Sequence, residues 1–197
     1  MTELEKAQKV SKIKRINERM AEIGRKFGKD SGIYRDYKNS IILSIPEDAL
    51  TGSGTISRSE KTLDKIPDYV LDDLLMKHTA GEVMKEARKE AAEESKLSGR
   101  PISVEEYLGA QDFVYNLMVD DPRGEIYEAF QIYWDAAGDG APRPSYVTLR
   151  DIILDMRSMD NMNKFGYPKE AQNIEDRLYK TIKARNERYS AAEVYFE

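Results

Sequence analysis

The stretch SVEEYLGAQDFVYNLM, residues 103–118, contains the two signals that decide the fold class. Ser103 stands three residues before Glu106, which is the arrangement of a capping box at the start of an α-helix. Large apolar side chains follow, and they are frequent enough to give this helix a face for burial: Val104, Leu108, Phe113, Val114, Leu117 and Met118. The stretch therefore predicts an amphipathic helix that contributes to a core.

The same start signal occurs at four other places, and each predicts a helix start: Thr2 with Glu5, Ser57 with Glu60, Thr79 with Glu82, and Ser190 with Glu193. A run of apolar residues at helical spacing predicts a first helix over about 3–27. ILSI, residues 42–45, is the only short run that reads as extended. The sequence thus predicts an all-α, elongated multi-helix protein with an N-terminal helix or helical hairpin and a C-terminal helical bundle.

Several expectations concern which side chains face the core. The helix of residues 80–97 has only a thin apolar line among Glu and Lys, so we expect it to be mostly exposed. Thr148 is expected to cap a helix that follows it. Two further helices supply inward-facing residues: Ile126, Phe130, Tyr133 and Trp134 in one, and Ile174, Leu178 and Ile182 in the last.

Loops and charge divide the chain into three predicted regions. TGSGT (51–55) and SGRP (98–101) separate a basic N-terminal helical region (1–50), linking helices (51–100) and an acidic helical bundle (101–197) with a loop at 138–148. Residues 1–38 hold 11 Lys and Arg against 6 acids, whereas residues 101–160 hold 4 against 12. A basic arm followed by an acidic body is therefore the pattern that a function has to explain.

Composition narrows the function classes. The chain has no cysteine, which excludes disulfides and thiolate metal sites. No apolar run approaches the roughly 18 residues of a membrane span, and the N-terminus is too charged for a signal peptide. We therefore expect no membrane association. The expected location is a host cytoplasm, with packaging in a virion as a further option. His78 is the single histidine, and we interpret it as a residue near a helix end. No metal or cofactor is expected, and a conventional enzyme is not the favoured class, although a site assembled from distant acids stays open.

The first helix carries the candidate nucleic-acid contacts. Lysine and arginine side chains release counterions when they meet phosphates, so a basic helix can lie along a nucleic-acid backbone. The candidates are Lys9, Lys12, Lys14, Arg15, Arg19, Arg25 and Lys26. Glutamates are interleaved among them, so a solvated helix face or a coiled-coil partner face fits the pattern as well.

The stretch GDGAPRPSYVTLRD, residues 138–151, is the candidate functional loop. Its glycines permit a mobile approach and its prolines stiffen the tip, so the loop can project one of three hydroxyl groups, those of Ser145, Tyr146 and Thr148. The plainer reading is a helix connection in which Thr148 is only a cap. The acidic body around it is expected to avoid free DNA and to bind basic channels on a protein, unless its charge serves only solubility.

The segments KIKRINERMAEIGRKFGKDSGIYRDY (12–37) and GTISRSEKTL (54–63), together with the charge order, give a layout that resembles the terminal proteins of small tailed phages that prime DNA replication with a protein. The resemblance implies a DNA-associating N-terminal region and an acidic priming domain that enters the duplex channel of a DNA polymerase. It also implies that a loop hydroxyl receives the first nucleotide. Ser57 and Ser59 compete for this role with Ser145, Tyr146 and Thr148.

The resulting hypothesis is a non-enzymatic phage-type protein that binds a DNA-replication partner, with a terminal protein as its sharpest form. A phage inhibitor or adaptor whose acidic surface mimics DNA is the first alternative. A virion or scaffolding component that associates through the first helix is the second.

Overall fold

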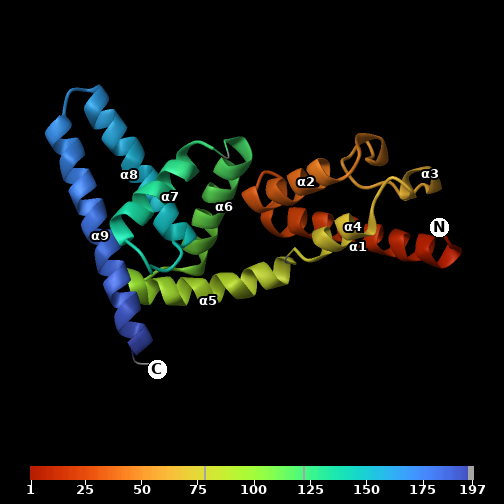
Figure 1. The fold of residues 1–197 in the computed structure, drawn as a ribbon, viewed down its shortest axis with the longest axis horizontal. Helices are drawn as coiled ribbons and strands as arrows, with labels where there is room; N and C mark the ends of the chain where they lie inside the picture. The colour runs from red at the N-terminus through yellow and green to blue at the C-terminus, as the bar shows by residue number, and fades with distance from the viewer. Residues whose placement is uncertain (78, 122, 195–197) are drawn as a thin grey trace. The chain divides into compact units, whose positions relative to one another are not determined.

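The computed structural model describes residues 1–77, 79–121 and 123–194, and within these ranges it is all-helical (Figure 1). The only β-type pairing among them is an isolated bridge between Leu50 and Ile56. The all-α prediction is therefore confirmed. The elements in chain order are α1 (Glu3–Phe27), α2 (Gly32–Ser44), the 3₁₀ helix η1 (Glu47–Ala49), α3 (Glu60–Leu63), α4 (Asp68–Leu75), α5 (Ala80–Ser98), α6 (Val104–Asp120), α7 (Glu125–Ala137), α8 (Tyr146–Lys164) and α9 (Pro168–Val194).

The chain forms two compact units, Met1–Lys85 (unit 1) and Glu86–Glu197 (unit 2). The border between them falls inside α5 and not at the loops 51–55 and 98–101, where the sequence suggests borders. A long helix continues through the border because its backbone hydrogen bonds are local and do not depend on which unit its side chains contact. Unit 1 has 16 Lys and Arg against 14 acids, and unit 2 has 15 against 22, so the acidic excess belongs to unit 2.

In unit 1, α1 and α2 form a helical hairpin (Figure 1). The apolar stripe of α1 is buried as predicted, with Ile13, Ile16, Met20 and Ile23 facing the other helices. Gly28 ends α1 at φ 91°, a left-handed conformation that favours glycine. The side chain of Ser31 then accepts the backbone N–H of Tyr34 and begins α2. These local signals explain why the chain turns back at this point.

Residues 42–45, the one short run that the sequence left open as extended, are helical in three of their four positions. Helix α2 runs through Ser44, and Ile45 is its extended C-cap. Ile41 is fully buried at the end of the apolar stripe of α2, so packing carries the helix past its β-branched residues. The loop 51–55 that follows is closed by a hydrogen bond from Thr51 N to Thr55 O (2.8 Å).

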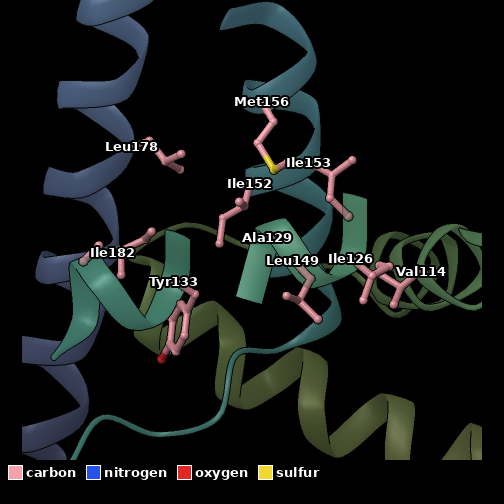
Figure 2. Packing of buried hydrophobic residues seen from close by; sticks show 11 residues of the cluster. Val114, Ile126, Ala129, Tyr133, Leu149, Ile152, Ile153, Met156, Leu178 and Ile182 are labelled. Atoms are coloured by element: carbon pink, nitrogen blue, oxygen red, sulfur yellow. The ribbon is translucent and has the colours of Figure 1, made fainter. Parts of the chain in front are cut away.

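The main core of unit 2 is built from α6, α7, α8 and α9 (Figure 2). Tyr133 and Ile152 are fully buried at its centre, and Val114, Leu178 and Ile182 contribute from the surrounding helices. At roughly 1.5–3 kcal/mol for each large apolar side chain removed from water, this cluster is the main source of stability for unit 2.

The expectation that α5 is mostly exposed is wrong for one of its faces. Ala87 and Ala91 are buried in a second cluster with Ile102, Tyr107 and Val147. Small side chains bury little area each, but they allow a neighbouring helix to approach closely. The alanine line of α5 is therefore a packing face.

Three of the five predicted capping pairs begin helices, those at Thr2, Thr79 and Ser103. Ser57 is not a cap, because α3 begins after Ser59. Ser190 lies inside α9. The expectation for Thr148 is also wrong, because Ser145 is the N-cap of α8 and accepts the backbone N–H of Thr148 at 3.1 Å. The helix starts earlier because Ser145 satisfies its free N–H group three residues on.

Two side chains that the sequence places inside are exposed, namely Trp134 (42%) and Met118 (43%). Tyr133 and Trp134 are adjacent, and neighbouring residues on a helix point about 100° apart, so only one of them can reach the centre. No helix in the described part of the chain is long and apolar enough to cross a membrane.

Candidate functional site

The loop between α7 and α8 is fixed to the body of unit 2. The hydroxyl group of Tyr133 donates a hydrogen bond to the carbonyl oxygen of Pro142. Figure 2 shows the Tyr133 ring within the core, with its oxygen pointing away from Ile152. Gly138 and Gly140 take φ values of 79° and 80°, which glycine adopts without strain. These contacts indicate a loop that is held against unit 2. The composition of the loop suggests a mobile, projecting tip instead.

The three candidate hydroxyl groups lie in different surroundings. The ring of Tyr146 packs edge-on against Tyr107 and Tyr115, with centroids 5.8 and 5.4 Å away, and its hydroxyl oxygen is 3.1 Å from that of Tyr115. Thr148 is buried, at 8% exposure. Ser145 is partly exposed. Tyr146 is partly exposed as well, but its hydroxyl is engaged with that of Tyr115, so Ser145 is the candidate that we follow further.

A chain of hydrogen bonds leads from Ser145 into the interior. Its Oγ lies 3.2 Å from Oγ1 of Thr148, and Oγ1 of Thr148 donates to Oε1 of Glu94 at 3.3 Å. Because Thr148 uses its single hydroxyl proton toward the carboxylate, the proton shared with Ser145 is the one on Ser145. The Ser145 oxygen also accepts the backbone N–H of Thr148, so one of its two lone pairs remains for another partner.

Glu94 and Arg185 form a buried ion pair at the inner end of this chain. Their side chains are 4% and 7% exposed, and Nε and Nη2 of Arg185 donate to the two carboxylate oxygens at 3.0 and 2.9 Å. Burial acts to lower the pKa of Arg185, but the hydrogen bonds and charge of Glu94 outweigh it and raise the pKa. Arg185 thus stays charged and holds the carboxylate in a fixed orientation.

Tyr133 connects the ion pair to the loop. Its hydroxyl oxygen lies 3.5 Å from Nη1 of Arg185 and also contacts Asn186 at 3.3 Å. Burial is the main cause that raises the pKa of Tyr133, so the phenol stays protonated and remains able to donate to Pro142. The ion pair, the loop and the start of α8 therefore form one connected polar network, which we call the Glu94 network: Glu94, Tyr133, Ser145, Thr148 and Arg185.

A second group of charges lies nearer the surface at the start of α6. Glu106 accepts hydrogen bonds from Arg100 (2.8 and 3.1 Å) and from Arg150 of α8 (3.0 Å). These donors lower the pKa of Glu106 to about 2. The glutamate therefore does not reach back to cap its own helix as a full capping box would, and it connects α6 to α8 instead.

The candidate nucleic-acid residues of α1 separate into two sets. Lys9 and Arg19 donate to backbone carbonyl groups at and just after the C-terminal ends of α3 and α4, respectively. Lys12 pairs with Asp68 and Asp72 of α4. These three residues hold unit 1 together. The other four are exposed: Lys14, which lies 4.0 Å from Glu18, and Arg15, Arg25 and Lys26. Only this second set is available to a partner without breaking contacts of the fold.

Sequence reasoning missed Glu94 and Arg185, although a signal for them exists. Glu94 stands three residues after Ala91 and so extends the alanine line of α5, and Arg185 stands three residues after Ile182 and extends the stripe of α9. A charged residue in register with a buried stripe needs a partner of opposite charge. The pattern indicates burial, but it does not reveal which residue is the partner.

His78 lies outside the described residues. Among the described residues, no group of three or more His, Cys, Asp or Glu side chains is placed to hold a metal ion. Comparison of the chain with protein-family models, with curated proteins and with solved structures finds no match in any of the three.

Proposed function

We propose that this chain is a non-enzymatic protein of phage-type DNA replication, and that it acts as a protein primer when a DNA polymerase partner joins the first nucleotide to Ser145. The observation that carries the proposal is the Ser145–Thr148–Glu94 chain, because it gives a partly exposed hydroxyl a defined proton direction toward a buried carboxylate. The N-terminus of α8 lies at the same point, and its positive end favours negative charge on the attacking oxygen.

The chemistry is a nucleotidyl transfer. The Ser145 oxygen forms a bond to the α-phosphorus of a nucleoside triphosphate, the bond from that phosphorus to the bridging oxygen breaks, and pyrophosphate leaves. The Ser145 proton passes to Oγ1 of Thr148, whose own proton passes to Glu94. The polymerase supplies the metal ions and holds the nucleotide. The protein is the substrate and primer, and the exposed basic side chains of α1 are free to contact DNA.

The test is an intact-mass measurement after incubation of the protein with a protein-priming polymerase, Mg²⁺ and one nucleotide. We expect the mass to increase by one nucleoside monophosphate, and peptide mapping to place the adduct on Ser145. The Ser145→Ala variant should form no adduct. An adduct that persists in Ser145→Ala moves the site to another hydroxyl, and the absence of any adduct with an active cognate polymerase refutes the priming function.

The role of the internal chain is tested with a matched pair at one position. Thr148→Val removes the hydroxyl with little change in shape, and we expect the rate of adduct formation to fall by about 10²-fold or more, as for the loss of an acid–base group. Thr148→Ser keeps the hydroxyl and should keep most of the rate. Equal rates in the two variants would show that Thr148 does not carry the proton.

An inhibitor or adaptor that mimics DNA is the second candidate, and the acidic excess of unit 2 favours it. Such a protein binds the polymerase and blocks DNA binding without becoming modified. Competition with duplex DNA in the absence of any mass increase is the outcome that selects it.

A further inference from the structure

The outer face of α7 carries a repeated pair of residue types. Tyr127 is followed by Glu128, and Trp134 is followed by Asp135, so an aromatic residue and an acid recur after seven residues. Seven residues are nearly two helical turns, which places the two pairs on one face about 10 Å apart along the axis. Gln131 lies between them, and all five side chains are exposed. We call these five residues the α7 stripe.

The aromatic residues of the α7 stripe are more exposed than large apolar side chains usually are. Tyr127 is 59% exposed, and Trp134 is 42% exposed. The indole is also held in place, because it packs edge-on against Tyr133 with centroids 5.0 Å apart. A ring that is already fixed loses little conformational entropy when a partner covers it. Tryptophan and tyrosine are the residues that most often anchor protein interfaces.

The charges of the α7 stripe have one sign and are not neutralised within the chain. Helix α7 contains no Lys or Arg. Arg157 pairs with Glu125, which stands three residues before Glu128 and lies outside the α7 stripe. Neither Glu128 nor Asp135 forms an ion pair with any residue that the structure describes. A partner with positive charge therefore gains both attractions without displacing an existing ion pair.

From these observations we infer that the α7 stripe is a docking surface for an arginine-bearing helix of a protein partner, with arginines repeated every seven residues. Arginine fits better than lysine because its planar guanidinium stacks on an aromatic ring while it pairs with a carboxylate in bidentate geometry. The ring and the carboxylate of each pair on α7 point about 100° apart, so a pair of arginines on the partner is needed to cover both. Nucleic acid does not fit, because its phosphates are repelled by Glu128 and Asp135. The inference does not depend on the modification of Ser145.

The single tryptophan of the chain lies in the α7 stripe, so its fluorescence reports directly on occupancy. The probe is a synthetic 21-residue helical peptide of alanine and glutamine with two Arg pairs seven residues apart. The control peptide has the same composition, with its second Arg pair shifted by two residues to another face. We expect the matched peptide to change the Trp134 emission and to bind at least 10-fold more tightly than the shifted peptide. No change with the matched peptide, or equal binding of both, overturns the inference.

Charge variants test the same surface from the other side. The double variant Glu128→Lys with Asp135→Lys should not bind the matched peptide. It should bind a version of this peptide in which glutamates replace the arginines. Glu105→Lys with Glu170→Lys makes the same charge change at exposed positions elsewhere in unit 2 and should alter the affinity less than about 3-fold. If the two double variants lose the same affinity for the matched peptide, net charge alone explains the loss, and the inference is overturned. Light scattering of the unmodified protein provides a last check. If it shows self-association that the double variant Glu128→Lys with Asp135→Lys loses, the occupant is a second copy of the chain, and the inference is contradicted.

Discussion

Two loops of this protein are built from similar residues but have different surroundings. In the 51–55 loop of unit 1, the hydroxyl groups of Thr51, Ser53 and Thr55 bond to one another at 2.7–3.5 Å and lie toward solvent. In the 138–145 loop of unit 2, Ser145 begins a chain that ends at a buried carboxylate. A hydroxyl group donates its proton in a defined direction only when a fixed acceptor lies next to it. The comparison explains why the second loop, and not the first, is the candidate site.

The largest effect is expected from breaking the ion pair behind the second loop. Glu94→Ala leaves the guanidinium of Arg185 buried without a counter-charge, so we expect a loss of about 3–5 kcal/mol in the free energy of unfolding. Urea titration followed by Trp134 fluorescence measures it. Glu93→Ala changes an exposed acid on the same helix and serves as the control. If the two variants lose equal stability, the buried pair is not the foundation of the site.

Loosening the loop itself should cost less. Tyr133→Phe keeps the ring in the core but leaves the carbonyl group of Pro142 without its donor, which we expect to cost about 1–3 kcal/mol. Faster amide hydrogen exchange in residues 138–145 should accompany the loss. Tyr127→Phe, on the exposed side of the same helix, should change neither quantity. Unchanged exchange in Tyr133→Phe would contradict the description of the loop as held.

The cap at Ser145 should contribute a smaller amount. Ser145→Ala removes the acceptor for the backbone N–H of Thr148, and we expect a loss of about 1 kcal/mol. Ser145→Asp provides another good capping oxygen and should recover most of this stability while it abolishes any nucleotide adduct. The pair of variants separates the structural role of Ser145 from its chemical role, with urea unfolding and intact mass as the two measurements.

Acid should weaken the support of α8 through Glu106. Because its pKa is lowered to about 2 in the folded protein, the carboxylate contributes stability that is fully present above pH 4.5 and is lost as the pH falls through about 2. Screening by solvent limits the contribution to about 1 kcal/mol at most. Glu106→Gln should show a flatter dependence of unfolding free energy on pH over this window, and an unchanged slope would contradict the assignment.

The smallest effects are expected in the first loop. Ser53→Ala removes a hydroxyl that bonds only to exposed neighbours, and we expect a change within about 0.5 kcal/mol. Circular dichroism during thermal unfolding is the measurement, because Trp134 belongs to the other unit. A loss as large as that of Ser145→Ala would remove the distinction between the two loops.

Local patterns predict most of the secondary structure of this chain, because a helix is stabilised by neighbours in sequence. The stripe of α1, the turn at Gly28 and the cap at Thr2 follow from residues three or four positions apart. Two of the failed predictions concern positions at which the local rule allowed two answers. Ser145 and Thr148 are both acceptable caps, and Tyr133 and Trp134 are both acceptable core residues.

The sequence by itself determined the helices, the acidic excess of residues 101–160 and the choice of Ser145 as one of three hydroxyls. Only the tertiary structure brought Glu94 of α5 and Arg185 of α9, which are 91 positions apart, to 2.9 Å and directed Thr148 toward them. It also left Trp134 outside while Tyr133 filled the core. The physical reason is that capping and periodicity act over a few residues, whereas the pairing of a buried charge depends on which helix packs against which.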